Sequence, residues 1–386
     1  MLPRRASPAS QVPPAKPELI FAQTLSFRAA KPAEGGESAR NVACRSRRAA
    51  GGGSIELSGR EAVRDGVSVV ASKVGSWLGL IVAVAVACWC SGCGRPESGK
   101  AGEGGGRLFG VTFQTMNNPF FVDLNRGLKQ VIEGRGDRLV TLDAQFNSLK
   151  QKNDIADLLQ QRPAALFINP VNWEGVKGSL IEARRQGVPA IIVDAPVSDP
   201  DLVLCQVASD NIEAGRLACA ALAEVNPKAK VVILHLSVNK ACIDRVDGFR
   251  AEMSKHPEMK LLETQEGKGT TEGARPVMRD LLGRFPELDA VFPINDPSAL
   301  GAISAIESAG LLGRVTVVTV DGSMEGVKAI KAGKLHSTSA QFPEEIGRVA
   351  AQAGYDHLAG KPVDKDIRIP VKLVTRTNAE EFLQAP

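Results

Sequence analysis

The sequence has few of the side chains that commonly support catalysis or metal binding. Its 386 residues include four histidines, and no close pair of them has the spacing of metal ligands. The motifs of serine hydrolases, phosphate-binding loops and zinc proteases, GxSxG, GxxxxGK[ST] and HExxH, are absent. We therefore predict no catalytic residue, no metal site, no cofactor and no enzymatic activity.

The chain also lacks a large excess of charge of one sign. It contains 47 Lys and Arg and 43 Asp and Glu, so the formal net charge is only +4, and much of the basic excess lies near the N-terminus. A balance this small gives no reason to expect a nucleic-acid partner. With 44% hydrophobic residues, the chain is long enough to form two or three domains of ordinary size.

The first hundred residues differ from the rest of the chain. Residues 1–73 are rich in Pro, Ala, Gly, Ser and Arg without a sustained period, and we predict an unstructured leader there. Because this leader precedes a signal-like segment, the simplest hypothesis is that the true translation start lies downstream of Met1. Residues 94–107 are glycine-rich, which predicts a flexible tether.

Residues 74–93 have the features of a lipoprotein signal peptide. The apolar segment 77–90 follows the basic Lys73, and a run of about fourteen apolar residues suits a signal peptide better than a spanning helix. The string Cys90-Ser91-Gly92-Cys93 resembles a bacterial lipobox, which implies that Cys93 is lipidated and anchors the protein to a membrane. A transmembrane anchor and a buried core helix are the two alternatives.

From residue 108 onward, strand-like runs alternate with helix-like ones. We predict strands at 108–113, 138–142, 165–168, 190–193, 203–207, 230–236, 259–265, 290–294, 315–320 and 371–374. The helices between them include 120–133, 149–160, 175–186, 244–254 and 343–358. This alternation falls into two series and predicts an α/β fold of two doubly wound, Rossmann-like domains with parallel sheets. A ligand cleft is expected between the carboxyl ends of the two sets of strands.

Polar side chains follow strand after strand in this scheme. Amides and carboxylates match the hydroxyl groups of a sugar, which both donate and accept hydrogen bonds, and aromatic rings can cover its C–H face. Each polar residue taken alone is better explained as a helix cap or a turn residue. Together they predict a site for a polyhydroxylated ligand, formed by Asn118, Asn169, Asp194, Asn295, Asp321 and Gln341, with Phe120 and Phe121 as the rings.

Residues 108–377 resemble the periplasmic sugar-binding proteins of the ribose-binding type, which are the receptors of ABC sugar importers. The strings that carry the resemblance include TMNNPFFVDLNRGL, LFINPVN, IIVDAP, VFPINDPSALGAISAIESAG and VTVDG. It implies an extracytoplasmic, monomeric protein that binds a monosaccharide or small polyol and delivers it to ABC permease subunits. It also implies a three-segment hinge near Ser209, Gln341 and Pro370, which groups residues 108–208 with 342–370, and 209–341 with 371–386.

The resemblance further implies which residues contact the ligand. These are Asn118, Phe120, Phe121, Asn169, Asp194, Arg245, Asn295, Asp321 and Gln341. Two departures from the ribose-binding pattern make us expect a ligand other than ribose. Ala195 stands where ribose-type members have an arginine, and the run from Gly267 to Thr270 stands where they have an aromatic residue. Gln114 and Trp173 are candidates to compensate for these losses.

Two alternative functions use the same binding fold. One is a sensor that presents its closed, ligand-loaded form to a chemoreceptor or histidine kinase. The other is a LacI-type transcription regulator, because residues 60–74, REAVRDGVSVVASKV, echo the helix-turn-helix of that family. Compared with the family's motif, one residue is missing between residues 66–68, GVS, and residues 72–74, SKV. The segment also runs directly into the signal-like apolar stretch, and both points favour the binding-protein interpretation.

Overall fold

The computed structural model describes residues 106–384. The predicted leader, signal peptide, lipidation site at Cys93 and helix-turn-helix echo lie outside these residues, as does nearly all of the predicted tether. Over the described part of the chain, no helix combines the length and the apolar character that crossing a membrane requires.

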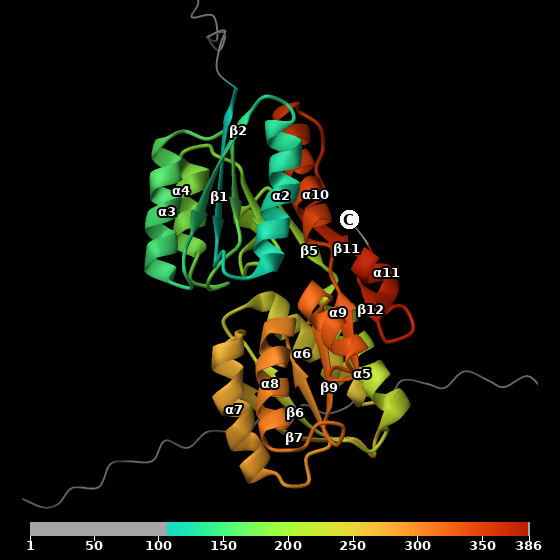
Figure 1. Cartoon of the computed structure of the whole chain (residues 1–386). Helices are drawn as coiled ribbons and strands as arrows, with labels where there is room; N and C mark the ends of the chain where they lie inside the picture. Colours follow the sequence, from blue (N-terminus) through green and yellow to red (C-terminus); the bar gives the residue numbers. More distant parts are fainter. Residues whose placement is uncertain (1–105, 385–386) are drawn as a thin grey trace, which may run out of the picture. The chain divides into compact units, whose positions relative to one another are not determined.

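The first domain is built on a parallel sheet with the strand order β11-β5-β4-β3-β1-β2. Its strands are β1 (Leu108–Phe113), β2 (Arg138–Asp143), β3 (Ala165–Ile168), β4 (Ala190–Val193), β5 (Cys205–Ser209) and β11 (Asp366–Ile369). Its helices are α2 (Pro119–Glu133), α3 (Ser148–Gln160), α4 (Lys177–Arg185) and α10 (Pro343–Leu358), and a short 3-10 helix, η1 (Pro200–Leu202), precedes β5. Helices α2 and α10 pack side by side on one face, and α3 and α4 cover the other (Figure 1).

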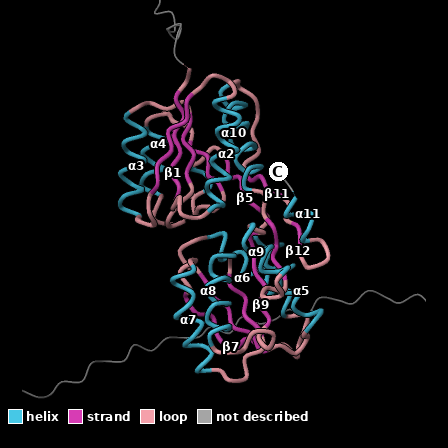
Figure 2. The backbone as a smooth tube through the Cα atoms, viewed as in Figure 1, coloured by secondary structure: helices cyan, strands magenta, loops and turns pink. Residues whose placement is uncertain are grey.

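The second domain repeats this plan with the strand order β12-β10-β9-β8-β6-β7. Its strands are β6 (Lys230–His235), β7 (Lys260–Glu266), β8 (Ala290–Pro293), β9 (Thr316–Asp321), β10 (Ser337–Ala340) and β12 (Lys372–Val374). Its helices are α5 (Asn211–Val225), α6 (Lys240–Met253), α7 (Thr271–Arg284), α8 (Asp296–Ser308), α9 (Met324–Lys331) and α11 (Ala379–Gln384). Figure 2 shows the strands of each domain in magenta between cyan helices.

The predicted fold of two α/β domains with mostly parallel sheets is confirmed. Strand β12 is the exception, because it pairs antiparallel with β10 at the edge of the second sheet. Strands β3, β4 and β8 are short, continuous apolar runs. They are buried along their whole length because helices cover both faces of each sheet. Buried side chains from both faces of each sheet form the cores of the two domains.

The chain passes between the two sheets three times. It leaves the first sheet after β5 at Ser209, returns between β10 and α10 at Gln341 and Phe342, and crosses again between β11 and β12. All three crossing segments are short and lie beside strand ends.

Helix α6 begins earlier than its sequence pattern predicts. The predicted start was residue 244, whereas the helix starts at Lys240 because the side chain of Asn239 caps it by accepting a hydrogen bond from the Cys242 N–H. This capped first turn brings additional side chains to the carboxyl end of β6.

Candidate functional site

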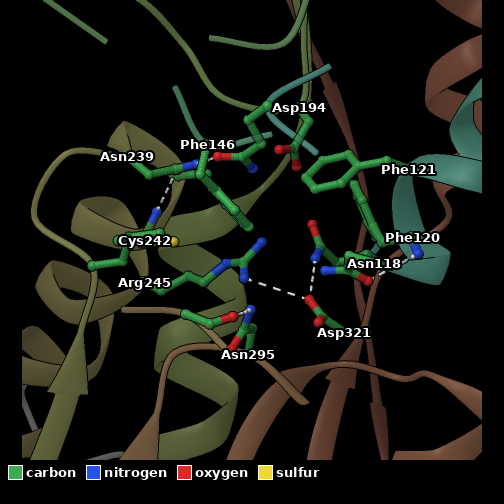
Figure 3. Close-up of a pocket in the computed structure, with 15 residues that line it drawn as sticks. Asn118, Phe120, Phe121, Phe146, Asp194, Asn239, Cys242, Arg245, Asn295 and Asp321 are labelled. Carbon is green, nitrogen blue, oxygen red and sulfur yellow. Dashed lines mark hydrogen bonds and ion pairs between the residues drawn. The ribbon is translucent and has the colours of Figure 1, made fainter. Parts of the chain in front are cut away.

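A pocket lined by residues of both domains lies where their strand ends meet. Eight of the nine predicted contact residues line it: Asn118, Phe120, Phe121, Asp194, Arg245, Asn295, Asp321 and Gln341. Figure 3 shows the side chains that it labels, among them Asn118, Asp194 and Arg245, converging from both domains.

Asn169 is the ninth predicted contact, and the structure places it beneath the pocket rather than on its surface. Its side chain is completely buried, and its Oδ1 accepts from the Gln114 N–H at 3.1 Å. Its Nδ2 donates to Asp194 Oδ2 at 3.0 Å and to the Val193 carbonyl at 3.3 Å. Since its side chain is engaged by protein atoms, Asn169 supports Asp194 and Gln114 instead of facing a ligand.

Arg245, in helix α6, lines the part of the pocket that the second domain contributes. Its Nε donates to Asn211 Oδ1 at 2.8 Å, and its Nη1 donates to the Ile294 carbonyl at 2.9 Å. The same Nη1 lies 3.5 Å from Asp321 Oδ1, which forms a buried ion pair. The guanidinium is thus held rigidly by three partners, and Arg245 is only 4% exposed.

Gln341 completes this network from the end of β10. Its Nε2 donates to Asp321 Oδ1 at 2.7 Å, which fixes the orientation of the amide. The Oε1 of the same amide is buried and has no hydrogen-bond partner. A buried acceptor without a donor is costly, so this oxygen is poised to accept a hydrogen bond from a ligand.

The two carboxylates of the pocket are shielded from solvent. Burial raises the pKa of Asp194 to about 6, and the charge of Asp321 adds to the rise, whereas the charge of Arg245 and the Asn169 amide oppose it. Burial likewise raises the pKa of Asp321, although Arg245 and Gln341 stabilise its ionised form. Both residues have positive φ, 67° at Asp194 and 138° at Asp321, which is unusual for residues other than glycine and is common at functional sites.

Asp296 is a further buried carboxyl group close to Asp321 but outside the pocket lining. Burial raises its pKa to about 7, and the charge of Asp321 adds to the rise. Its Oδ2 accepts from the backbone N–H and the hydroxyl of Ser323, both at 2.7 Å, and its Oδ1 accepts from Thr338 Oγ1 at 2.9 Å. Its own N–H donates to Asp321 Oδ2 at 3.2 Å, so it positions that carboxylate from below.

Two of the amides combine helix capping with a place in the pocket. Asn118 Oδ1 accepts from the Phe120 N–H at 3.0 Å at the start of α2. Asn295 Oδ1 accepts from the Ser298 N–H at 3.1 Å at the start of α8, and its Nδ2 donates to the Gly269 carbonyl at 3.0 Å. The interpretation of these residues as helix caps is therefore correct, and capping is what holds them at the pocket.

Adjacent phenylalanines supply apolar faces from the first domain. Phe120 and Phe121 pack edge to face with ring centroids 5.3 Å apart, and Phe121 also packs against Phe113 at 5.9 Å. Both rings are buried in the core of the first domain while still lining the pocket. Their positions are therefore fixed before any ligand arrives.

Several lining residues were not predicted as contacts from the sequence. They are Phe146, Leu236, Asn239, Ala241, Cys242 and Gly269. Three of them lie at the start of α6, so the capping motif at Asn239 was the signal that would have found them. Gln114, one of the candidates for compensation, does line the pocket, and Ala195 does not.

Hydrogen bonds join the two domains beside this site. Asn239 Nδ2 donates to Gln114 Oε1 at 3.5 Å, and the Trp173 N–H donates to the Val238 carbonyl at 3.2 Å. Trp173 thus contributes through its backbone, and its indole is absent from the pocket lining. Both bonds connect loops at strand ends and tie the first domain to the second.

Within residues 106–384 we find neither a metal-binding cluster nor a thiol with a lowered pKa. No cluster of His, Cys, Asp and Glu within that range could hold a metal ion. Cys205, Cys219 and Cys242 are free and buried, and burial raises the pKa of each thiol to about 12. Protonated thiols at neutral pH are poor nucleophiles.

Two domains with mostly parallel sheets, three crossing segments and an amide-lined pocket between strand ends are the features of a hinged ligand-binding protein. Comparison with known proteins shows that the chain belongs to the periplasmic binding protein domain family, whose model matches residues 109–362. The resemblance to binding proteins of the ribose type is therefore confirmed. Membership of this family implies an extracytoplasmic location and a role in solute binding.

Individual relatives show the same relationship. The ribose import binding protein of Bacillus subtilis is 34% identical over 284 residues, which cover 73% of this chain and 92% of that protein. An ABC transporter solute binding protein from Bacillus halodurans, solved with myo-inositol, has a TM-score of 0.69 and 25% identity, covering 73% of this chain and 99% of that one. The binding protein of an arabinose ABC transporter from Shewanella, solved with L-arabinofuranose, has a TM-score of 0.68 and 29% identity, covering 71% and 94%.

Proposed function

We propose that this protein binds a neutral monosaccharide or small polyol between its two domains and delivers it to the permease of an ABC importer. The observation that carries the proposal is the network of Arg245, Asp321 and Gln341, which ends in the unpaired Gln341 Oε1. A ligand hydroxyl that donates to this oxygen would satisfy the one buried acceptor that the network leaves open. The ligands of the B. halodurans and Shewanella proteins are a cyclitol and a furanose, which are rich in such hydroxyls.

The charges of the pocket support a neutral ligand. Its lining contains two carboxylates, Asp194 and Asp321, and one guanidinium, Arg245. Since Arg245 is already engaged by Asp321, Asn211 and the Ile294 carbonyl, it is poorly placed to neutralise an added anion. An anionic sugar, such as a uronate or sugar phosphate, would meet uncompensated negative charge in a desolvated site.

Closure of the domains would couple binding to transport. The three crossing segments provide the hinge, and the bonds from Asn239 to Gln114 and from Trp173 to Val238 would hold the closed form. A permease could distinguish this closed form from an open one. We further propose that the protein acts as a monomer and that Cys93 carries a lipid that retains it at the membrane.

The test of the ligand class is a thermal-shift screen of the full-length protein in mild detergent. A ligand that binds only the folded protein must raise the melting temperature. We expect stabilisation by one or more neutral sugars or polyols and none by the matching uronates or sugar phosphates. Stabilisation by anionic sugars alone, or by another class of solute alone, would refute the proposal.

The lipid anchor has a separate test. Cys93→Ala should abolish the incorporation of labelled fatty acid while leaving sugar binding unchanged, because the thiol that would carry the lipid is lost and Cys93 lies before the binding domains in the sequence. Cys219→Ser is the matched control and should be labelled like the parent. Absence of label from the parent would favour a transmembrane anchor instead.

A further inference from the structure

The turn between β2 and α3 holds a phenylalanine in an unusual position. Phe146 is 44% exposed, and its backbone φ is 55°, in the left-handed region that bulky residues rarely adopt. The preceding Gln145 has a φ of 53°, so two consecutive residues other than glycine share this conformation. Such a turn costs conformational free energy and persists only where its surroundings hold it in place.

Hydrogen bonds hold this turn against the pocket. The Phe146 N–H donates to the Gln114 carbonyl at 2.6 Å, and the Gln145 N–H donates to Asp143 Oδ1 at 2.8 Å. The Asn147 N–H donates to the Ala144 carbonyl at 2.9 Å and closes the turn. Because Gln114 itself lines the pocket, the bond from Phe146 ties the turn directly to the site.

The side chain of Phe146 extends into the pocket (Figure 3). Unlike Phe120 and Phe121, it belongs to none of the hydrophobic cores of the two domains. The turn therefore places a large apolar ring where it gains little from packing within the protein. A contact with a ligand would supply the burial that this ring lacks.

The apolar lining from the second domain is small by comparison. It consists of Leu236, Ala241, Cys242 and Gly269, none of which has an aromatic ring. Gly269 has a φ of 68°, and a Cβ added there would approach Leu236 Cδ2 to 3.1 Å, so a larger side chain is disfavoured at this place. All the aromatic lining therefore comes from the first domain, and Phe146 is its only ring outside the core.

We propose that Phe146 is a specificity-determining residue whose ring packs against the C–H face of a cyclic ligand. This inference rests on the proposed function and narrows it to a ring sugar or cyclitol. A closed ring presents several C–H groups on one fixed face, which an aromatic side chain can cover. A linear alditol must first lose chain entropy to present such a face, so it gains less from the contact.

The experiment compares two glycine variants of neighbouring residues. Phe146→Gly removes the ring, and Gln145→Gly makes the same backbone change at a left-handed position one residue earlier, outside the pocket lining. Both variants relax the turn and both raise the entropy of the unfolded chain, so we expect their melting temperatures without sugar to agree within about 2 °C. Calorimetric titration of the full-length protein would use L-arabinose, D-ribose and myo-inositol as cyclic probes and xylitol as the linear probe.

We expect Phe146→Gly to weaken binding of the cyclic probe that the parent binds best by about tenfold or more. Binding of xylitol should change by less than about threefold, and Gln145→Gly should bind every probe as the parent does. Phe146→Tyr keeps the ring and should restore most of the affinity.

Three outcomes would overturn this inference. Unchanged affinity of Phe146→Gly for all probes would show that the ring does not contact the ligand. Equal losses in Phe146→Gly and Gln145→Gly would assign the effect to the turn rather than the ring. Failure of the parent to bind any sugar or polyol would refute the proposed function itself, a result that is seen before any variant is made.

Discussion

Asp194→Asn should stabilise the protein without sugar and weaken its binding of sugar. The folded protein raises the pKa of Asp194 from 3.8 to about 6, so at neutral pH it holds a carboxylate that burial disfavours. The rise of about two pH units corresponds to a cost of up to about 3 kcal/mol, at 1.36 kcal/mol per unit. Asparagine has nearly the same shape and can still accept from the Asn169 Nδ2, so the variant removes the charge and retains this contact.

The dependence of this effect on pH follows from proton binding. Between pH 3.8 and about 6, the folded state binds the Asp194 proton more tightly than the unfolded state does. The free energy of unfolding of the parent therefore falls as the pH rises through this window and levels off above it. The advantage of Asp194→Asn should be largest at pH 7 to 8, where the parent carboxylate is ionised, and should shrink towards pH 4.

The assay is chemical denaturation of parent and variant, without sugar, at pH 4.5 and pH 8. We expect the variant to gain about 1 to 3 kcal/mol at pH 8 and clearly less at pH 4.5. Binding of a sugar identified in the screen should weaken by about tenfold or more, because a charged acceptor for ligand hydroxyls is lost. In the parent, affinity should also fall as the pH drops below about 6. A variant that is less stable than the parent at pH 8, or that has unchanged affinity, would refute the reasoning.

Two further predictions concern the pocket and the packing of the second domain. Asn295→Ala should weaken sugar binding at least about fivefold, because it removes a pocket amide and frees the Gly269 carbonyl, whereas Cys219→Ser, a buried change away from the pocket, should leave the affinity nearly unchanged in the same titration. Gly215→Ala should lower the free energy of unfolding by about 1 to 3 kcal/mol, because a Cβ there would collide with the Arg245 carbonyl where α5 packs on α6. Gly283→Ala is its control, since a Cβ meets nothing there on the exposed side of α7, and it should raise stability by up to about 1 kcal/mol in the same denaturation assay. Equal effects of the two glycine changes would contradict this account of the packing.

The sequence by itself determined the fold class and much of the site. Apolar runs such as 290–293 and helical spacing such as that of 119–133 predict alternating strands and helices, and alternation leaves few arrangements other than parallel sheets. Parallel strands carry their carboxyl ends to one edge of a sheet, so Asp194, which follows β4, had to lie at that edge of the first sheet, and Asp321, which ends β9, at that edge of the second. The spacing of apolar residues along a strand or helix is a local property, so it can be recognised from the sequence alone.

Only the tertiary structure decided which side chains face the pocket and which support it. Asn169 and Asp194 both follow buried strands, yet packing turns one beneath the surface and leaves the other exposed to the cleft. Phe146 and Asn239 enter the site through a left-handed turn and a helix cap, and their meeting with the other domain depends on how the two domains close. The raised pKa of Asp194 is likewise a consequence of burial by residues distant in the sequence, because desolvation depends on everything that surrounds a group in space.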